Sequence, residues 1–397
     1  MISLAARDIA HSWSKYVFTG VGLGLLIGVT LSMAGIYRGM VDDAQVLLRN
    51  SHADVWVVQK DTQGPYAESS SLPDDIYRGV LGMPGVEQAA NVTYFTMQVQ
   101  HQGKNTRVMV VGFEPGQPGA PPSLVAGRHV TRSHYEAVAD VKAGFKLGEK
   151  IRIRRNDYTI VGLSQRTVST GGDPMVFIPL ADAQAAQFQK DNDAIVSGRE
   201  RTAANPAFNR PSVPGLLEAV QASQTTSHNV NAVLVRVRPG WDAAQVAADI
   251  QRWKHLQAYT YADMEEIAVQ KLIATSAKQI GLFLVILTLV STAIVSFIIY
   301  TMTLGKIREI AVLKLIGTRN STIAWMILQE SIGLGLVGFI IGKTVATLWA
   351  PVFPKYVLLL PLDAVLGLLV IVLVCTLASV MAIRAALKVD PAEAIGG

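Results

Sequence analysis

The sequence is poor in cysteine and in charge. Cys375 is its single cysteine among 397 residues, and only 16% of the residues are charged. Because Cys375 lies in the last apolar run, the soluble part has no disulfide bond and no thiolate metal site. The formal net charge of +5 is small for this length. It fits cytoplasmic loops better than nucleic-acid binding.

Motifs for nucleotide hydrolysis and metal binding are also missing. The run Gly338–Thr344 looks like a P-loop, but three residues separate its glycines instead of four, and it lies in an apolar run. His129 and His134 are five residues apart without the nearby acids of a metal site. We therefore predict no catalytic residue, no metal site, no cofactor and no ATPase motif in this chain.

Hydrophobic residues are concentrated in four long runs, although they make up only 50% of the chain. The first, Val17–Tyr37, has 21 residues without a formal charge, enough to cross a bilayer once. A cleaved signal peptide is the alternative, but its apolar region is typically about 7–15 residues long. We predict a membrane α-helical protein with four transmembrane helices, at residues 17–37, 279–303, 322–349 and 362–383.

A large soluble α+β domain is predicted between the first two spans, at residues 38–278. It exceeds the length of one average domain, which predicts two subdomains. Segments typical of strands and helices alternate with glycine and proline breaks. Strands are predicted at 53–58, 91–100, 106–113, 150–154, 158–163 and 233–237, and helices at 74–81, 180–188, 243–256 and 261–278.

Residues 189–231 differ in composition from the rest of this domain. They are rich in Asn, Gln, Ser and Pro and show little apolar periodicity. Long irregular segments are usually either functional or disordered. We predict a mobile loop here, and leave open whether it docks a partner or is a solvated insertion.

Basic residues predict the topology. Residues 1–16 contain two Lys or Arg, residues 304–321 four, and residues 384–397 two, whereas residues 350–361 contain one. Short cationic segments stay in the cytoplasm. We therefore expect an interfacial helix at 1–16, both termini in the cytoplasm, and an extracytoplasmic domain at 38–278.

The basic segment Lys306–Ser321 separates the second and third spans. Its apolar residues surround its charges on nearly all sides, so it has no clean amphipathic stripe. A helix that is apolar all round is buried on more than one side. One interpretation is a helix between the membrane domain and a cytoplasmic partner, ended by Gly317 and followed by a helix starting at Asn320 or Ser321. The other is an ordinary loop that only fixes topology.

The run K-x-R-E-I-A-x-L-K-x-I-G from Lys306 to Gly317 resembles the segment after the second span in permeases of the MacB/FtsX (type VII) superfamily of ABC transporters. The D-P-A-E-A ending at Asp390–Ala394 and the run from Gly144 to Gly162 resemble the same family. The resemblance implies that this segment is a coupling helix that contacts an ATPase subunit. The implied coupling residues are Lys306, Arg308, Glu309, Ile310, Leu313, Lys314 and Gly317.

The resemblance also implies partners and a location. It implies a dimer of permeases with two ATPase subunits, which would bind ATP and Mg, in the inner (plasma) membrane of a bacterium. Because no ATPase domain is fused here, the chain resembles DevC-type permeases, which work with a periplasmic adaptor and an outer-membrane channel. The implied function is efflux by mechanotransmission. An FtsX-like signalling subunit that controls a cell-envelope hydrolase is the alternative, and the cargo stays open.

Two features inside the spans complete the candidate sites. Glu330 lies in the third span, where a charge is costly, so it should face protein or water and can pair with a basic residue of the coupling segment. Gly20, Gly24 and Gly28 fall on one face of the first span. Small residues at this spacing allow close helix packing, which we assign to the dimer.

Overall fold

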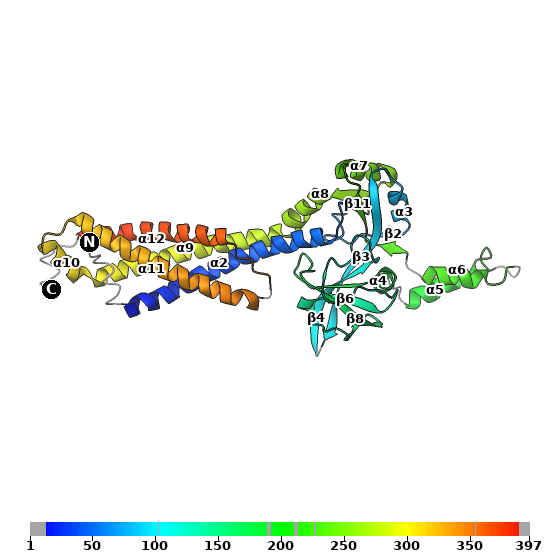
Figure 1. Ribbon diagram of the computed structural model, residues 1–397, viewed down its shortest axis with the longest axis horizontal. Coiled ribbons are helices and arrows are strands. Elements are labelled where there is room, and N and C mark those ends of the chain that lie inside the picture. The colour runs from blue at the N-terminus through cyan, green and yellow to red at the C-terminus, as the bar shows by residue number, and fades with distance from the viewer. Residues whose placement is uncertain are drawn as a thin grey trace. The chain divides into compact units, whose positions relative to one another are not determined.

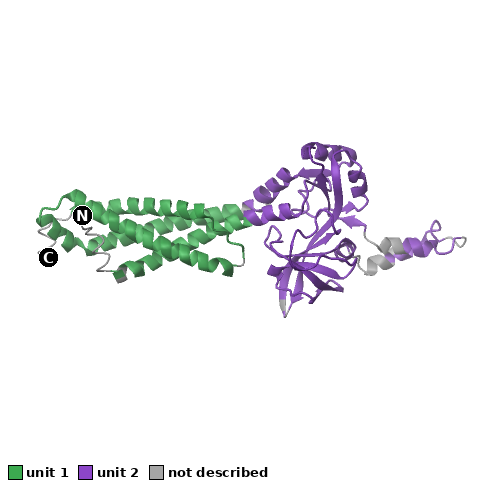
Figure 2. Ribbon diagram, viewed as in Figure 1, with its two compact units in different colours: residues 1–40, 275–397 green, residues 41–274 purple. Residues whose placement is uncertain are grey.

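The computed structural model describes residues 13–101, 103–188, 192–209, 213–225, 228–353 and 355–388. The chain divides into two compact units, one formed by residues 1–40 with 275–397 and the other by residues 41–274 (Figure 2). The predicted tail at 384–397 is described only as far as Lys388, which ends the last helix. We refer to the two parts as the membrane unit and the α+β unit.

Four helices of the membrane unit are long and apolar enough to cross a bilayer. Each contains one predicted span, but the helices extend beyond the apolar runs because backbone hydrogen bonding continues into the polar flanks. Trp13–Tyr16 begin the first of them, so the described end of the predicted interfacial helix is continuous with the span; residues 1–12 lie outside the described residues. The four helices are α2 (Trp13–Asn50), α9 (Ala274–Gly305), α11 (Asn320–Trp349) and α12 (Pro361–Lys388) (Figure 1).

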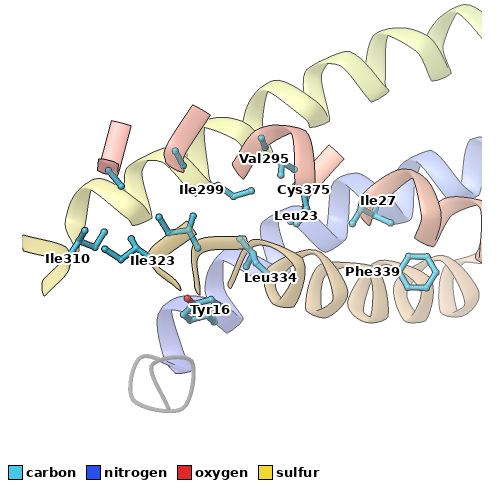
Figure 3. Packing of buried hydrophobic residues seen from close by; sticks show 14 of the residues in the cluster. Tyr16, Leu23, Ile27, Val295, Ile299, Ile310, Ile323, Leu334, Phe339 and Cys375 are labelled. Atoms are coloured by element: carbon cyan, nitrogen blue, oxygen red, sulfur yellow. The ribbon is translucent and has the colours of Figure 1, made fainter. Parts of the chain in front are cut away.

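Two short helices connect these long ones. The helix α10 (Ile307–Leu315) follows α9, and the 3₁₀ turn η3 (Ala350–Val352) follows α11. The buried hydrophobic cluster of the unit draws residues from α2, α9, α10, α11 and α12 (Figure 3). The unit is therefore packed as one core that includes the short connecting helix.

The α+β unit is organised around the 16-residue strand β3 (Val86–His101). Its first half pairs with β11 and its second half with β4, so one strand belongs to two parts of a mixed sheet. The strand order is β12, β1, β11, β3, β4, β9, β6, β8 and β5, with β7 paired to β8. The bounds are β1 (Val55–Val58), β4 (Lys104–Phe113), β5 (Leu124–Gly127), β6 (Glu136–Asp140), β7 (Lys150–Ile153), β8 (Asn156–Ser164), β9 (Met175–Pro179), β11 (Ala232–Val237) and β12 (Gln257–Thr260); a small second sheet pairs β2 (Leu72–Pro73) with β10 (Asn229–Val230).

Two separate hydrophobic cores accompany the two halves of β3, although residues 41–274 form one compact unit. One lies among β1, β3, β11, α3 (Ile76–Leu81) and α7 (Ala243–Lys254). The other lies among β4, β6, β7, β8, β9 and α4 (Leu180–Gln187), near the 3₁₀ turn η1 (Val141–Ala143). Three of the predicted helices correspond to α3, α4 and α7, and the six predicted strands to β1, β3, β4, β7, β8 and β11, with bounds that differ by a few residues.

Residues 189–231 are not the irregular loop that the composition predicted. They contain α5 (Asn192–Ala204), α6 (Leu216–Thr225) and the short strand β10. The two helices pack against each other, and Gln221 Nε2 donates to the carbonyl oxygen of Arg199 over 3.2 Å. Their apolar stripes are short, which is why periodicity did not reveal them.

A break in helical geometry lies near the end of the α+β unit. The predicted amphipathic helix at 261–278 is instead α8 (Tyr261–Glu266), which has a capping box formed by Thr260 and Asp263, and then the π-helix η2 (Ile267–Leu272). The helix α9 begins two residues later. Wide turns of this kind are rare, occur mostly as single-turn bulges inside α-helices, and are frequent at functional sites.

Candidate functional site

The short helix α10 ends as the sequence indicated. Gly317 has φ +88°, the left-handed conformation that glycine adopts without strain. Its N–H donates to the carbonyl of Lys314 over 3.0 Å, and the N–H of Thr318 donates to the carbonyl of Leu313 over 3.0 Å. This pair of bonds is a Schellman motif. The next helix starts at Asn320, one of the two predicted positions, and Arg319 before it makes no side-chain cap.

One face of α10 is buried in the membrane unit. Ile310 and Ala311 are 1% and 0% exposed. Ile310 belongs to the same hydrophobic cluster as Ile323 (Figure 3) and Ile327 of α11. Lys314 is half-buried, and its Nζ donates to the carbonyl oxygen of Leu387 near the end of α12 over 2.8 Å. These contacts fix α10 to two spans.

A buried ion pair fixes the start of α10. Lys306 Nζ lies 3.0 Å from Glu330 Oε2, and the two side chains are only 15% and 10% exposed. Lys306 Nζ also lies 3.4 Å from the hydroxyl oxygen of Tyr16 and 5.6 Å from its ring centroid. A buried charge without its partner is strongly destabilising, so this pair holds the α9–α10 junction against α2 and α11.

The opposite face of α10 is exposed and mixes charge with apolar area. Arg308 and Glu309 are exposed in its first turns. Val312, Leu315 and Ile316 are 46%, 64% and 75% exposed. Leu315 and Ile316 lie three and four residues after Val312, so all three share one side of the helix. We call this set, with Arg308 and Glu309, the exposed face of α10.

The structure thus separates the seven residues assigned to coupling. Lys306 and Ile310 turn into the membrane unit, and Leu313 and Lys314 are half-buried. Of the predicted side chains, only those of Arg308 and Glu309 lie on the exposed face. The predicted set left out Val312, Leu315 and Ile316, because an all-round apolar helix gives no sign of which residues face outward.

The three predicted packing glycines lie against α11 of the same chain. A methyl group at Gly24 would lie 2.7 Å from Ile341 Cγ2 and 3.0 Å from the carbonyl oxygen of Gly338, and one at Gly28 would lie 3.0 Å from the carbonyl oxygen of Gly342. A methyl group at Gly20 would lie 2.8 Å from Val337 Cγ1. The close approach therefore joins two helices within one chain, and this face is not open to a second copy.

The histidines considered in the sequence do not come together. His134 Nδ1 lies 2.6 Å from Asp182 Oδ1 on α4. Among the described residues, no group of three or more His, Cys, Asp and Glu side chains is placed to hold a metal ion.

This fold defines a class: multi-pass membrane proteins with a large α+β domain inserted between the first and second spans. Two family models match the chain, the MacB-like periplasmic core domain over residues 17–253 and the FtsX-like permease C-terminal domain over residues 281–391. The chain therefore belongs to the MacB/FtsX-type permeases of ABC transporters.

Relatives of similar length support this assignment. An uncharacterized ABC transporter permease of Mycobacterium tuberculosis (strain H37Rv) is 25% identical over 398 residues, covering 100% of both chains. Another, from Mycobacterium bovis, is 23% identical over 398 residues, again covering 100% of both chains. These relatives are named as permeases, not as ATPases.

Two solved structures are similar to part of the chain. The extracellular domain of the noncanonic ABC-type transporter YknZ from Gram-positive bacteria has a TM-score of 0.34 at 11% identity, covering 52% of this chain and 99% of that domain. The periplasmic region of MacB from Actinobacillus actinomycetemcomitans has a TM-score of 0.33 at 8% identity, covering 57% and 96%.

Proposed function

We propose that this chain is the permease subunit that passes ATP-driven motion of a separate ATPase subunit through α10 to the periplasmic domain. The observation that carries the proposal is the asymmetry of α10, which has one face packed in the membrane unit and one exposed. Exposed apolar residues rimmed by charge are typical of protein-interaction sites. The exposed face of α10, with Val312, Leu315 and Ile316, is the docking surface for the ATPase.

The buried contacts explain why force on this surface would reach the spans. Ile310 shares a buried cluster with Ile323 and Ile327 of α11, and Lys314 Nζ donates to the carbonyl oxygen of Leu387 near the end of α12. The Lys306–Glu330 pair connects the α9–α10 junction to α11. Because packed cores change between discrete arrangements rather than deforming smoothly, a displacement of α10 would carry these helices with it.

The proposed complex has two such permeases and two ATPase subunits that bind ATP and Mg²⁺, with both termini of the permease and α10 in the cytoplasm. Its work is export, with a periplasmic adaptor and an outer-membrane channel. The match of residues 17–253 to a MacB-like periplasmic core domain supports this candidate. The match of residues 281–391 to an FtsX-like domain supports a second, in which the same motion controls a cell-envelope hydrolase.

The docking surface is tested with the double variant Leu315→Asp, Ile316→Asp. We expect it to insert normally but to lose at least about tenfold of its affinity for a co-expressed ABC ATPase, because two charges replace apolar contacts. Ser321→Asp is the matched control, since it adds an acid at an exposed position beyond the proposed surface. Co-purification and ATP hydrolysis in proteoliposomes are the measurements.

Equal ATPase capture and hydrolysis by the double variant and the control would refute the docking surface. Export and signalling are then separated by the partner of the periplasmic domain. Capture of an adaptor supports export, and capture of a hydrolase supports the second candidate.

A further inference from the structure

A groove runs between three helices of the membrane unit. Its volume is about 320 Å³, and its walls come from α2, α9 and α12. Lining side chains include Leu23 and Ile27 of α2, Leu284 of α9, and Leu366 and Val370 of α12. The groove is therefore apolar along the depth of the spans.

The threonines in its walls do not change this character. Thr30 donates to the carbonyl of Leu26 over 2.9 Å, and Thr288 donates to the carbonyl of Leu284 over 2.7 Å. Thr292 donates in the same way to the carbonyl of Thr288. Because these hydroxyl hydrogens are used within their own helices, they are not offered to a ligand. Ser291 Oγ, a buried hydroxyl without a hydrogen-bond partner among the described residues, is a polar exception in the lining, and the apolar side chains around it suit an alkyl chain.

One end of the groove is strongly polar. Asp363, in the first turn of α12, lines the groove, and its Oδ1 lies 2.6 Å from Arg38 Nη2 of α2. The Arg38 side chain is 36% exposed and the Asp363 side chain 10% exposed. A guanidinium group favours phosphate, and a carboxylate favours an ammonium group. The end of the groove therefore offers one charge of each sign.

From this combination we propose that the groove binds one membrane phospholipid with a zwitterionic head group. An acyl chain lies between α2, α9 and α12, the phosphate contacts Arg38, and the ammonium group contacts Asp363. The volume is at the lower end of small-molecule pockets, which span about 300–1,000 Å³. This site goes beyond the proposed coupling function and does not depend on it.

Native mass spectrometry of the full chain tests the proposal. The chain is released from detergent micelles containing equal amounts of phosphatidylethanolamine, phosphatidylglycerol and diacylglycerol with the same acyl chains. We expect one retained phosphatidylethanolamine per chain. The variant Thr288→Phe, which fills the groove, should reduce this retention about tenfold or more, since the added bulk occupies the space of the acyl chain.

Leu289→Phe is the matched control, because Leu289 is the next residue of α9 and is 65% exposed. It should retain the lipid like the unmodified chain. Asp363→Asn should abolish the preference for phosphatidylethanolamine over phosphatidylglycerol. If Thr288→Phe does not insert, Val370→Phe in the groove and Leu369→Phe outside it repeat the comparison on α12.

Equal retention in the groove variant and its control would overturn the proposal, because it would mean that only surrounding lipids bind. A preference of the unmodified chain for phosphatidylglycerol, or no retained lipid at all, would also overturn it. The assay contains no ATPase, so its failure leaves the coupling proposal standing, and loss of ATPase capture leaves the lipid site standing.

Discussion

The membrane unit has an ion pair at each end of its spans, and the two pairs differ in exposure. Lys306 and Glu330, 3.0 Å apart, have side chains 15% and 10% exposed. Arg38 and Asp363, 2.6 Å apart, have side chains 36% and 10% exposed. Breaking a buried pair leaves an uncompensated charge, whereas a half-exposed pair contributes little to stability. The first pair therefore anchors α10, and the second is suited to meet a ligand.

The largest loss of stability should come from removing one partner of the buried Lys306–Glu330 pair. Glu330→Ala leaves the Lys306 ammonium group without its carboxylate partner in the core. We expect a loss of about 3–5 kcal/mol in stability. Thermal unfolding of the detergent-solubilised chain measures it.

Replacing both partners sharpens this test. In Lys306→Met with Glu330→Leu no charge remains buried, so most of the lost stability should return while α10 keeps its packing. If the double variant is as unstable as Glu330→Ala, the loss comes from packing and not from an unpaired charge.

A smaller effect is expected where α2 meets α11, between the two pairs. Gly24→Ala places its methyl group 2.7 Å from Ile341 Cγ2, which should cost about 1–3 kcal/mol through overpacking. Gly22→Ala is the control, since nothing lies within 4 Å of its added methyl group, and it should be neutral or stabilising by up to about 1 kcal/mol. The difference in melting temperature between these variants measures the close approach, and equal values would contradict it.

The Arg128–Glu136 ion pair of the α+β unit extends the comparison. Its arginine side chain is half exposed to water. The Arg128 guanidinium donates to both carboxylate oxygens of Glu136 over 2.9 and 2.5 Å and lowers the pKa of that carboxyl to about 2. Because the folded-state pKa lies below the ordinary 4.5, this stabilisation is full above about pH 4.5 and is lost as the pH falls toward about 2.

Glu136→Gln removes this titration. Unfolding of the full chain between pH 7 and pH 2 should show the unmodified protein more stable at neutral pH, with the two curves converging as the pH approaches 2. A constant difference across this range would show that Glu136 does not titrate in it.

The smallest change in stability should come from the Arg38–Asp363 pair. Arg38→Gln should cost less than about 1 kcal/mol, because the Arg38 side chain is 36% exposed. The same variant should weaken retention of phosphatidylethanolamine. A loss as large as that of Glu330→Ala would remove the distinction between the two pairs.

In the membrane unit, the sequence predicts the spans and the end of α10, but it does not predict which residues contact a neighbouring helix. The four spans follow from length and hydropathy alone. The end of α10 follows from one glycine, Gly317. The inward face of α10 does not, because Ile310 on one side and Leu315 on the other are equally apolar, and only contacts with α11 distinguish them. The partner of the α2 glycines was missed for the same reason.

In the α+β unit, the sequence predicted the fully buried strand β1 but not the fully buried strands β6 and β9. The strands β6 (Glu136–Asp140) and β9 (Met175–Pro179) are buried at every residue, so they do not alternate. The acidic residues at the two ends of β6 are also atypical of a buried strand, so the sequence did not indicate one. Asp140 is buried because its carboxylate accepts hydrogen bonds from the backbone and hydroxyl of Thr167, a contact that no local pattern shows.

The most direct test of the central claim is the accessibility of Ile316, which is 75% exposed. In an Ile316→Cys variant, the native Cys375 gives little background because it is 1% exposed. A membrane-impermeant maleimide should leave intact cells unlabelled and label inverted vesicles, and a bound ATPase subunit should protect the cysteine. Labelling of intact cells, or equal labelling of inverted vesicles with and without the ATPase, would contradict the account.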